Sequence, residues 1–516
     1  MNPTYTPAEK HAVYLRNCRL LVVACAISGA YYLWWLVVDA RPANLILFGI
    51  LISAELFNVI QAAGFWYTIS TQRWTVPPDA DFSATGERVD AFITVYGEPR
   101  DVVENTVRAV AAIRHPRLTV WVLDDGPDPE IARIAERHGA AYLTRPDRRG
   151  AKAGNVNHAL GLSAGDFVII FDADHAPVPE FLERTMACFA EESVAFVQTP
   201  QSYRNRFENR VAAGAHEQQA LFYGPILRGK DSASAVFSCG TNVIFRRTAL
   251  EHVGGIPEDS ITEDLRVSLV LKRQRWTSVY VSEVLATGLG PVDVAGYFSQ
   301  QKRWARGGLD ILMHHRPFFP GMGGATSVQY GLSFLYWFTG LAYAGYVVLP
   351  LAFLFFGLRP VQVPNEYPSH FLPYVFITLF TMVYASEFTL TFRGVWFTLA
   401  AFPVHIAALF QAVFGRAARF VVTSKVARAR SLRPVWLHLV TLTALGVAIP
   451  YGLVIDGFTP SVVNNVAFAL GHILIVSGFV RLALRPETIT HQGLIECDDT
   501  EPHPSPTEHA AKGGRR

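Results

Sequence analysis

Charged residues are scarce in this 516-residue sequence: 17% are Asp, Glu, Lys or Arg, whereas 50% are hydrophobic. The formal net charge is only +2. A nearly neutral chain gives no electrostatic indication of a nucleic-acid partner or a strongly acidic partner, and we expect neither. The hydrophobic residues form long runs near both ends with a polar stretch between them, which indicates a membrane protein that carries a soluble domain.

Motifs that would identify several other classes of protein are missing. No GxxxxGK(S/T) motif is present, which argues against a nucleoside triphosphatase, and no GxGxxG follows a predicted strand, which argues against a dinucleotide enzyme. The five cysteines have no CxxC spacing, so they predict neither a zinc site nor a disulfide framework; they are Cys18, Cys25, Cys188, Cys239 and Cys497.

Six apolar runs are long enough to cross a membrane, because a hydrocarbon core of about 30 Å requires roughly 20 residues of helix. They are Leu20–Val38, Ala43–Ile69, Val328–Phe356, Phe371–Phe392, Val435–Ile455 and Val462–Leu484. The first run is too long for the apolar segment of a signal peptide and lacks a persuasive cleavage site, so we expect it to remain as an anchor.

The basic residues predict the orientation. The richest basic segment contains Arg416, Arg419, Lys425, Arg428, Arg430 and Arg433, and short segments of this kind remain in the cytosol. Six spans then place both termini and the soluble domain in the cytosol of a multi-pass cell-membrane protein. We expect two transmembrane helices in 1–71 and a cytosolic domain with interfacial helices in 72–325. Residues 326–485 should form four transmembrane helices, with a cytosolic loop at about 416–433. Residues 486–516 should form a disordered tail.

Within the soluble domain, short β-branched runs alternate with helical patterns, which predicts a mainly parallel α/β sheet. Three runs end in acidic residues: Val89–Val95 before Tyr96-Gly97-Glu98, Leu118–Leu123 before Asp124-Asp125-Gly126, and Phe167–Phe171 before Asp172-Ala173-Asp174. Ligands bind at the carboxyl ends of strands in such sheets, so these residues predict one site.

Asp172 and Asp174 have the spacing that suits Mg²⁺ or Mn²⁺ on a diphosphate, because such cations take one or two carboxylates together with phosphate oxygens and water. An acidic turn after a strand is an equally good interpretation of this motif alone. Lys152 stands among small residues before a predicted helix, where an ammonium group can reach a nucleotide, although a solvated lysine also fits.

Two later motifs also admit two interpretations. Thr262-Glu263-Asp264 opens a helix, where an aimed carboxylate can act as a base, but Ser260 and Glu263 also match a capping box, which the spacing alone favours. Gln300, Arg303 and Trp304 fall on one helix face, where they can meet a diphosphate and stack on a sugar. An amphipathic interfacial helix explains the same residues.

Four of these motifs together resemble the D, DxD, TED and QxxRW set of processive family 2 glycosyltransferases. They are Asp124-Asp125-Gly126, Asp172-Ala173-Asp174, Thr262-Glu263-Asp264 and Gln300-x-x-Arg303-Trp304. Several further stretches resemble bacterial cellulose synthase catalytic subunits over about Tyr96 to Lys425: Ala151-Lys152-Ala153-Gly154-Asn155, Phe171-Asp172-Ala173-Asp174-His175, Gln198-Thr199-Pro200, Ser238-Cys239-Gly240-Thr241 and Arg303-Trp304-Ala305-Arg306-Gly307. Phe420–Lys425 is similar to the FxVTxK gating loop of cellulose synthases, which in that family inserts over the bound nucleotide-sugar. This similarity favours a glucan-type synthase.

The resemblance implies a GT-A fold, inversion at the anomeric carbon and a metal-dependent reaction with Mg²⁺ or Mn²⁺. It assigns catalysis to Asp264 with Glu263 and Thr262, and the metal to Asp172 and Asp174. It assigns the nucleotide-sugar to Tyr96, Glu98, Asp124, Asp125, Lys152, Gln300, Arg303, Thr423 and Lys425. The acceptor would meet Trp304, Cys239 and Gly240.

The expected reaction is polymerisation of UDP-glucose to β-1,4-glucan. We expect the growing polysaccharide to cross the lipid bilayer. A periplasmic partner subunit is implied by the resemblance alone. The alternatives are β-1,3-glucan, mixed-linkage glucan, mannan or glucomannan, transfer of one sugar to a lipid carrier, or a nucleotide-binding transporter or scaffold. Gly97 replaces the usual Asn of the family, which bears on the donor. The stretch after Leu484 is too short for a PilZ barrel, so we expect no direct activation by cyclic-di-GMP.

Polar residues inside the predicted spans give a final indication. Glu55, Asn58 and Gln61 recur at every third position of the second span. Together with Glu387 and the aromatic residues Tyr336, Trp337, Tyr343 and Tyr346, they could line a path for sugars. Helix–helix packing and interfacial aromatic belts explain them equally well.

Overall fold

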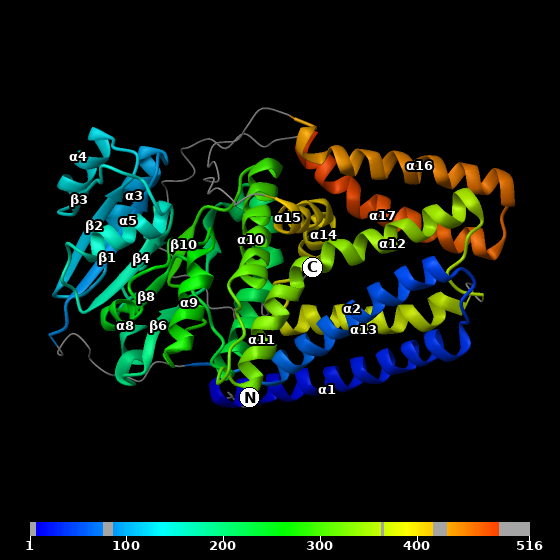
Figure 1. Cartoon of the computed structure of the whole chain (residues 1–516), viewed down its shortest axis with the longest axis horizontal. Coiled ribbons are helices and arrows are strands. Elements are labelled where there is room, and N and C mark those ends of the chain that lie inside the picture. The colour runs from blue at the N-terminus through cyan, green and yellow to red at the C-terminus, as the bar shows by residue number, and fades with distance from the viewer. Residues whose placement is uncertain (1–6, 76–85, 363–365, 416–430, 485–516) are drawn as a thin grey trace, which may run out of the picture.

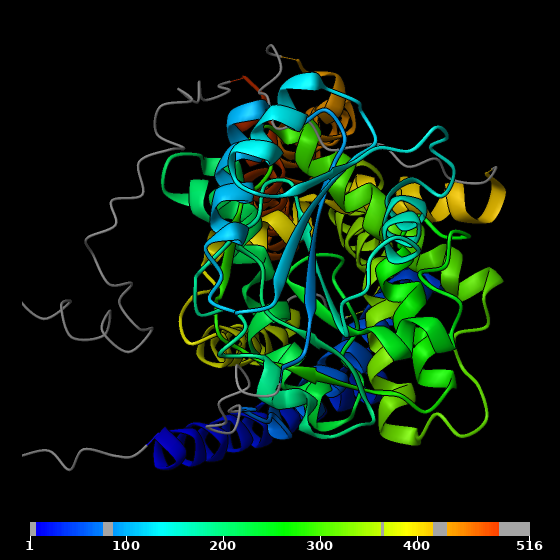
Figure 2. The same cartoon turned by 90° about the vertical axis from the view of Figure 1, so that its left-hand side faces the viewer.

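The computed structural model describes residues 7–75, 86–362, 366–415 and 431–484. The molecule is elongated, with an α/β domain at one end and long, roughly aligned helices at the other (Figure 1). Figure 2 looks along the long axis, with the α/β domain in front of these helices. The polar middle of the sequence therefore forms the predicted domain, between the two apolar parts of the chain.

The α/β domain is built on a seven-stranded sheet of order β3-β2-β1-β4-β8-β6-β9. The strands are β1 Val89–Val95, β2 Leu118–Asp124, β3 Ala141–Leu143, β4 Phe167–Asp172, β6 Val194–Gln198, β8 Val243–Arg246 and β9 Thr277–Tyr280. Strand β8 runs antiparallel to both of its neighbours, and the other pairs are parallel. The expectation of a mainly parallel sheet is confirmed, with this one exception.

The strand register aligns the predicted acidic residues. Val95 at the end of β1 pairs with Asp124, and Thr94 pairs with Asp172. The carboxyl ends of the three central strands therefore meet at one edge of the sheet. A second small sheet of β5 Ala176–Pro177, β10 Ala286–Gly288 and β7 Ser202–Tyr203 lies beside this edge.

Helices cover both faces of the large sheet. They are α3 Arg100–Ala111, α4 Pro129–Arg137, α5 Ala151–Leu160, α8 Arg247–His252 and α9 Glu263–Arg273. Val107 of α3 packs with Ile93 on one face, whereas Val156 of α5 and Val267 of α9 pack with Phe92 on the other. The central strands are buried on both faces, which explains their nearly continuous β-branched and aromatic sequences.

The remaining helices form the apolar bundle or lie between the bundle and the α/β domain. They are α1 Pro7–Trp34, α2 Leu45–Ser70, α6 Arg210–Leu221, α7 Leu227–Ser232, α10 Val294–His314, α11 Gly324–Leu335, α12 Thr339–Phe356, α13 Tyr367–Ala385, α14 Phe392–Ala400, α15 Phe402–Phe414, α16 Trp436–Asp456 and α17 Pro460–Leu484. The short helices are η1 Trp35–Asp39, η3 Met186–Ala190, η4 Arg204–Phe207, η5 Phe222–Ile226, η6 Tyr336–Phe338 and η8 Arg433–Val435.

Six helical segments in the described part of the chain are long and apolar enough to cross a membrane: Ala8–Asp39, Leu45–Ser70, Gly324–Phe356, Phe392–Phe414, Arg433–Asp456 and Pro460–Leu484. The expected fourth run, Phe371–Phe392, is divided. Helix α13 ends at Ala385 and α14 begins at Phe392. The intervening turn contains Glu387 and Phe388 in left-handed conformations, and neither a proline nor a glycine announces it in the sequence.

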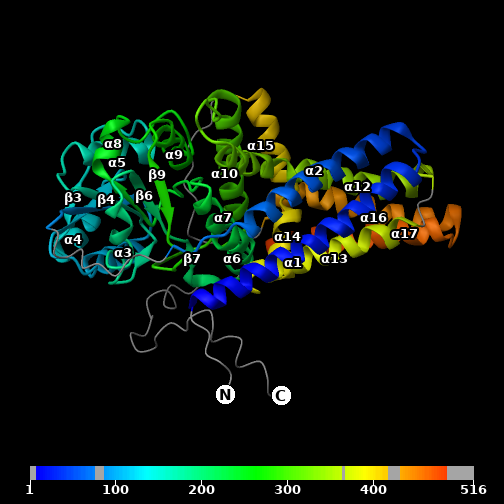
Figure 3. The ribbon, with the colours of Figure 1, turned by 90° about the horizontal axis from the view of Figure 1, so that it is seen from below.

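Helix α13 differs in direction from α14 and α15. Helix α13 lies alongside α1, parallel to the long axis (Figures 1 and 3). Helices α14 and α15 are separate helices that meet at Ala401, and they pack against α6 and α10. Figure 3 shows α15 crossing the direction of the bundle. The apolar segment Phe392–Phe414 therefore lies where the α/β domain meets the bundle.

The polar residues of α2 bind tyrosines of neighbouring helices. The hydroxyl of Tyr367 donates to Oε1 of Glu55 at 3.1 Å, and Nδ2 of Asn58 donates to the hydroxyl of Tyr346 at 2.7 Å. Glu387 does not lie in a span: its carboxylate pairs with Arg228 of α7 at 2.6 Å. The predicted stripe on α2 therefore lies inside the bundle, whereas Glu387 belongs to a clamp between α13 and α7.

Candidate active site

Three side chains that suit a divalent cation converge after β4. Ligand atoms of Asp172, Asp174 and His175 all lie within 4.8 Å of one another. Asp174 and His175 are 4% exposed, with Nδ1 of the imidazole 3.3 Å from Oδ1 of Asp174. Nε2 of His175 is buried beside Gly288 and makes no hydrogen bond within the described part of the chain, whereas Nδ1 is the ring nitrogen that faces Asp174. Carboxylates are ligands that Mn²⁺ and Mg²⁺ prefer, so this trio is a candidate cation site.

Glu98 stands close to this trio. Its Oε2 accepts a hydrogen bond of 2.6 Å from the backbone amide of Tyr96, within the turn after β1. Burial raises the pKa of Glu98, and the charges of Asp174 and Asp172 raise it further. The carboxyl ends of β1 and β4 thus contribute to one acidic site, as the sequence predicts.

Lys152 links this acidic site to the loop before β8. Its ammonium group bonds to the carboxylate of Asp172 and donates to the carbonyl oxygen of Gly240 at 2.6 Å. Burial opposes the positive charge, but Asp172 and Glu263 raise the pKa of Lys152 above its usual value. Lys152 also lowers the pKa of Asp172 against the effect of burial. The lysine side chain is 15% exposed and is paired with Asp172, so it is a largely buried cation and not a solvated one.

Helix α9 begins beside this lysine. Thr262 is its N-cap residue and makes no side-chain capping bond, while the hydroxyl of Ser260 accepts from the amide of Thr262 at 3.2 Å. The capping-box interpretation is therefore wrong, because Ser260 lies two residues before the helix. Burial and the charge of Asp264 raise the pKa of Glu263 to about 7. Burial also raises the pKa of Asp264, whereas Arg303 and Lys152 lower it.

Gly240 lies directly against the first turn of α9. Its φ is +82°, a conformation that glycine adopts without strain, and a Cβ atom there would stand 3.1 Å from Oδ2 of Asp264. The neighbouring Cys239 is fixed by its amide, which donates to Oε1 of Gln198 at 2.8 Å. Burial raises the pKa of the Cys239 thiol, so this side chain is an uncharged wall of the site.

The acidic pair after β2 is saturated by protein groups. Asp124 accepts from the amides of Gly126 and Asp128 and from the hydroxyl of Tyr142 at 2.9 Å. Asp125 receives both Nε and Nη2 of Arg145, at 2.6 and 2.7 Å. The same guanidinium donates to the carbonyl oxygen of Ala151, which fixes the start of α5 beside Lys152. These aspartates therefore position the site as well as flank it.

Tyr96 is the exposed member of this edge. Its side chain is 49% exposed, and the guanidinium of Arg148 lies 5.6 Å from the ring centroid. An aromatic ring with an accessible face beside a basic loop suits a flat base.

Helix α10 carries Gln300, Arg303 and Trp304, all partly exposed, whereas the intervening Gln301 is 2% exposed. Helical spacing places the three residues on one face, and Lys302 between them is partly exposed as well. The charge of Arg303 acts on Glu263 and Asp264, so this face is directed towards the start of α9.

Glycines let α10 approach its neighbours closely. A Cβ atom on Gly307 would collide with the side chain of Thr262. A Cβ atom on Gly308 would lie 2.6 Å from Nε1 of Trp337, in the segment that joins α11 to α12. Helix α10 therefore connects the acidic site with the entrance to the bundle.

The structure brings together most of the predicted residues, and it adds some that the sequence reasoning missed. Arg145 and the candidate ligand His175 were not predicted, although His175 directly follows the DxD motif. Thr423 and Lys425, and the predicted gating loop to which they belong, lie outside the described residues, as does the tail after 484.

Comparisons with known proteins agree with this geometry. A family described as Glycosyltransferase like family 2 matches residues 87–307. Over this range the chain is similar to family 2 glycosyltransferases. A second family, described as Cellulose synthase, matches residues 251–471, so the match extends from the glycosyltransferase domain into the helical bundle.

Curated proteins that are similar to this chain include bacterial cellulose synthases. Cellulose synthase 1 of Komagataeibacter xylinus is 33% identical over 386 residues, which are 71% of this chain and 24% of that protein. The UDP-forming catalytic subunit of Xanthomonas axonopodis pv. citri (strain 306) is 35% identical over 310 residues, 58% of this chain and 42% of that one. The chain spans between about a quarter and a half of the length of the curated relatives it matches.

A solved structure supports the fold of the glycosyltransferase domain. The mannosyltransferase PcManGT of Pyrobaculum calidifontis, in complex with GDP-Man and Mn2+, is similar with a TM-score of 0.52 and 18% identity. The similarity covers 72% of this chain and 100% of that one. The GT-A-type fold expected from the sequence is therefore confirmed.

Proposed function

We propose that this chain is a processive, inverting glycosyltransferase that polymerises UDP-glucose into β-1,4-glucan and passes the polymer through its own helices. The observation that carries the proposal is the position of Gly240. Its carbonyl oxygen accepts a hydrogen bond from Lys152, and its Cα lies against Asp264. A donor-binding cation and a candidate base thus meet at one glycine. The relatives described as UDP-forming cellulose synthases support the choice of donor and product.

Asp172 and Asp174 would hold Mg²⁺ or Mn²⁺, with His175 as a third ligand. The two carboxylates and the ring nitrogen of His175 that faces Asp174 fit such a cation. The bound metal would neutralise the diphosphate of the donor. Tyr96, Glu98, Asp124 and Asp125 would surround the nucleotide.

Asp264 would accept the proton of the acceptor hydroxyl, whose oxygen bonds to the anomeric carbon as the bond to UDP breaks. Attack from the face opposite UDP converts an α-linked donor into a β-linked product. Glu263 and Thr262 would support this base, and Gln300 and Arg303 would stabilise the departing diphosphate. Lys152 would do the same from the other side of the site.

Trp304 would stack on the acceptor sugar, with Cys239 and Gly240 beside it. Since α10 meets Trp337 at Gly308, a polymer leaving this position would enter the bundle. We place α1, α2, α11–α12, α13, α16 and α17 across the membrane, and α14–α15 at its surface. Six spans then keep the glycosyltransferase domain and both termini in the cytosol, as the basic segment at 416–433 indicates. A periplasmic partner subunit is expected by resemblance to the cellulose synthases.

The test uses purified full-length protein in nanodiscs with Mn²⁺ or Mg²⁺ and, separately, UDP-glucose, UDP-N-acetylglucosamine or GDP-mannose. Sustained UDP release from UDP-glucose, a product cut by a β-1,4-glucanase and loss of both in Asp264→Asn are expected. A product cut only by another glycanase would contradict the linkage and leave the mechanism intact. One transfer per acceptor would indicate transfer to a lipid carrier and contradict processive synthesis.

A further inference from the structure

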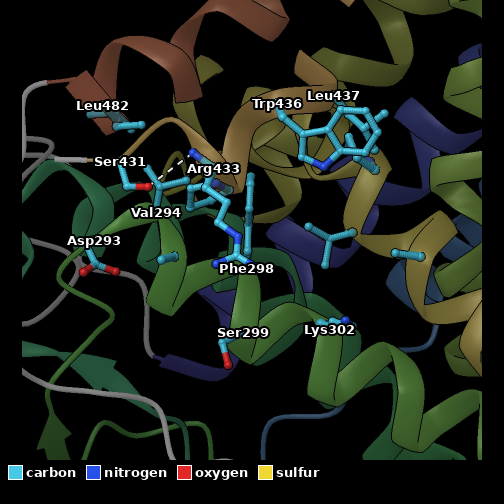
Figure 4. Close-up of a pocket in the computed structure, with 16 residues that line it drawn as sticks. Asp293, Val294, Phe298, Ser299, Lys302, Ser431, Arg433, Trp436, Leu437 and Leu482 are labelled. Carbon is cyan, nitrogen blue, oxygen red and sulfur yellow. Dashed lines mark hydrogen bonds between the residues drawn. The ribbon is translucent and has the colours of Figure 1, made fainter. Parts of the chain in front are cut away.

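A cleft of about 590 Å³ lies outside the catalytic site, between α10 on one side and α15, α16 and α17 on the other. Its volume falls in the range of pockets that hold small ligands. Apolar side chains supply most of its lining, among them Val294, Phe298, Val404, Leu437 and Leu482. Figure 4 shows these elements around the cavity.

Two cations from separate elements stand at this apolar cleft. Lys302 comes from α10, and Arg433 from the turn before α16. The side chain of Arg433 extends towards Phe298 of α10 (Figure 4). No ion pair joins either cation to another residue within the described ranges. Among the described residues, the lining of the cleft therefore includes two cations that are not ion-paired.

One acidic residue also lines the cleft, but it has another role. Oδ1 of Asp293 accepts a hydrogen bond of 2.6 Å from the amide of Gly296 and thereby caps α10. Lys302 lies eight residues after Val294, which is about 12 Å along the helix. Asp293 is therefore at the opposite end of the cleft from Lys302 and is directed to the helix terminus.

The cleft lies at the level where the bundle meets the α/β domain. Helix α16 begins at Trp436 and α17 ends at Leu484, so the cleft contacts both helices at this end (Figure 1). Trp436, one of the lining residues, is 57% exposed. Exposed tryptophan together with Lys or Arg is typical of the membrane–water interface.

We propose that this cleft binds one anionic glycerophospholipid from the cytosolic leaflet. The phosphate lies between Lys302 and Arg433, and the acyl chains follow Leu437 and Leu482 towards the bilayer. An apolar floor with two unpaired cations at the headgroup level suits such a lipid better than a free anion, which has no apolar part to bury. The inference depends on the membrane placement of α16 and α17 proposed above.

Binding is tested on the full chain without any sugar donor, so that its failure is distinct from failure of the proposed catalysis. The protein is prepared in nanodiscs of phosphatidylcholine with a small fraction of phosphatidylglycerol, released into detergent, and examined by native mass spectrometry for retained lipid. The wild type should retain one phosphatidylglycerol in preference to phosphatidylcholine. The double variant Lys302→Gln/Arg433→Gln should bind it roughly 30-fold more weakly, because each surface cation contributes about five-fold.

Arg481→Gln is the matched control, because Arg481 is exposed near the end of α17 and does not line the cleft. It should retain the lipid as the wild type does. Ala407→Phe fills the cleft without changing charge and should also reduce retention. Equal retention of both lipids by the wild type, unchanged retention in the double variant, or displacement by millimolar inorganic phosphate would each overturn the proposal.

Photocrosslinking identifies the occupant directly. p-Benzoylphenylalanine replacing Ala407 should add the mass of one phosphatidylglycerol after illumination. A crosslink to the chain's own residues 416–430, or to a second copy, in place of the lipid adduct would contradict a lipid occupant.

Discussion

The carbonyl oxygen of Gly240 accepts a hydrogen bond of 2.6 Å from the ammonium group of Lys152, 88 residues earlier in the chain. The same ammonium group bonds to Asp172. This lysine therefore connects the candidate metal site with the backbone beside the candidate base. In the proposed reaction, the departure of the diphosphate and the deprotonation of the acceptor would both depend on its position.

Lys152→Met should reduce kcat/KM for UDP-glucose by at least about 100-fold, because it removes a buried cation from the diphosphate side of the site. The assay is UDP release by protein in nanodiscs. Arg149→Met is the control, since Arg149 lies in the same loop and its side chain is 89% exposed. A loss of less than about three-fold in both variants would show that Lys152 does not contact the donor.

Gly240→Ala tests the approach of the loop to Asp264. We expect kcat to fall by about ten-fold or more, because the new Cβ atom stands 3.1 Å from Oδ2 of Asp264. Gly254→Ala is a close control: its φ is +80°, and a Cβ atom there meets nothing within 4 Å. Both variants carry a backbone strain of about 1–2 kcal/mol. Equal losses of activity in the two variants would assign the effect to strain alone.

The dependence of the rate on pH should reveal Glu263. Its pKa is raised to about 7, so it is protonated below that pH and charged above it. Ionisation places a second negative charge beside Asp264 and makes that carboxylate a stronger base. The rate should therefore rise as pH increases through about 7, and Glu263→Gln should abolish this step.

The same substitution provides the counter-test. If the rise near pH 7 persists in Glu263→Gln, another group is responsible for it. Asp264→Asn should be inactive at every pH from 5 to 9, because an amide cannot accept the proton of the acceptor.

Mn²⁺ binding should depend on His175 as well as on the two aspartates. Electron paramagnetic resonance of the purified protein without donor measures free Mn²⁺. His175→Ala and Asp174→Asn should each weaken binding by at least about ten-fold, because each removes a ligand from the trio. His158→Ala, on α5 and outside the trio, should have no effect. Unchanged affinity in His175→Ala would limit the ligands to the aspartates.

Local signals explain why much of the site could be predicted from sequence. Asp172 and Asp174 lie at the end of a strand, and Asp264 lies in the first turn of a helix. The ends of strands and the starts of helices are indicated by the residues next to them in the sequence. The approach of Gly240 to Lys152 and the pairing of Asp125 with Arg145 are different. These contacts join distant segments, and no periodicity or spacing encodes them.

The membrane part shows a second limit of sequence reasoning. Helices α14 and α15 are as apolar as a membrane span, but they lie across the bundle against α6 and α10. Their orientation follows from the break at Ala401 and from the turn before Phe392, which brings Glu387 to Arg228. Hydropathy measures composition alone and cannot distinguish an apolar helix that runs along the bundle from one that lies across it.

The clamp around Arg228 should stabilise the joint between the two parts of the molecule. Its side chain is 7% exposed, donates to Glu387 at 2.6 Å and to Oε1 of Gln72 at 2.9 Å, and lies 4.7 Å from the ring centroid of Trp74. Arg228→Met leaves the buried oxygen of Gln72 unpaired and removes the partner of Glu387. Because Glu387 is 44% exposed and can be rehydrated, we expect the free energy of unfolding to fall by about 2 kcal/mol. Breaking a fully buried ion pair would cost more.

Arg88→Met supplies the comparison for this clamp, since Arg88 and Asp166 form an ion pair whose side chains are 52% and 47% exposed. Such a pair contributes less than about 1 kcal/mol. Thermal unfolding in nanodiscs should therefore show a clearly lower midpoint for Arg228→Met than for Arg88→Met. Equal midpoints would mean that the cation–aromatic and hydrogen-bond contacts of Arg228 only offset the cost of burying it, and the joint would then depend on apolar packing between α1, α2 and α13.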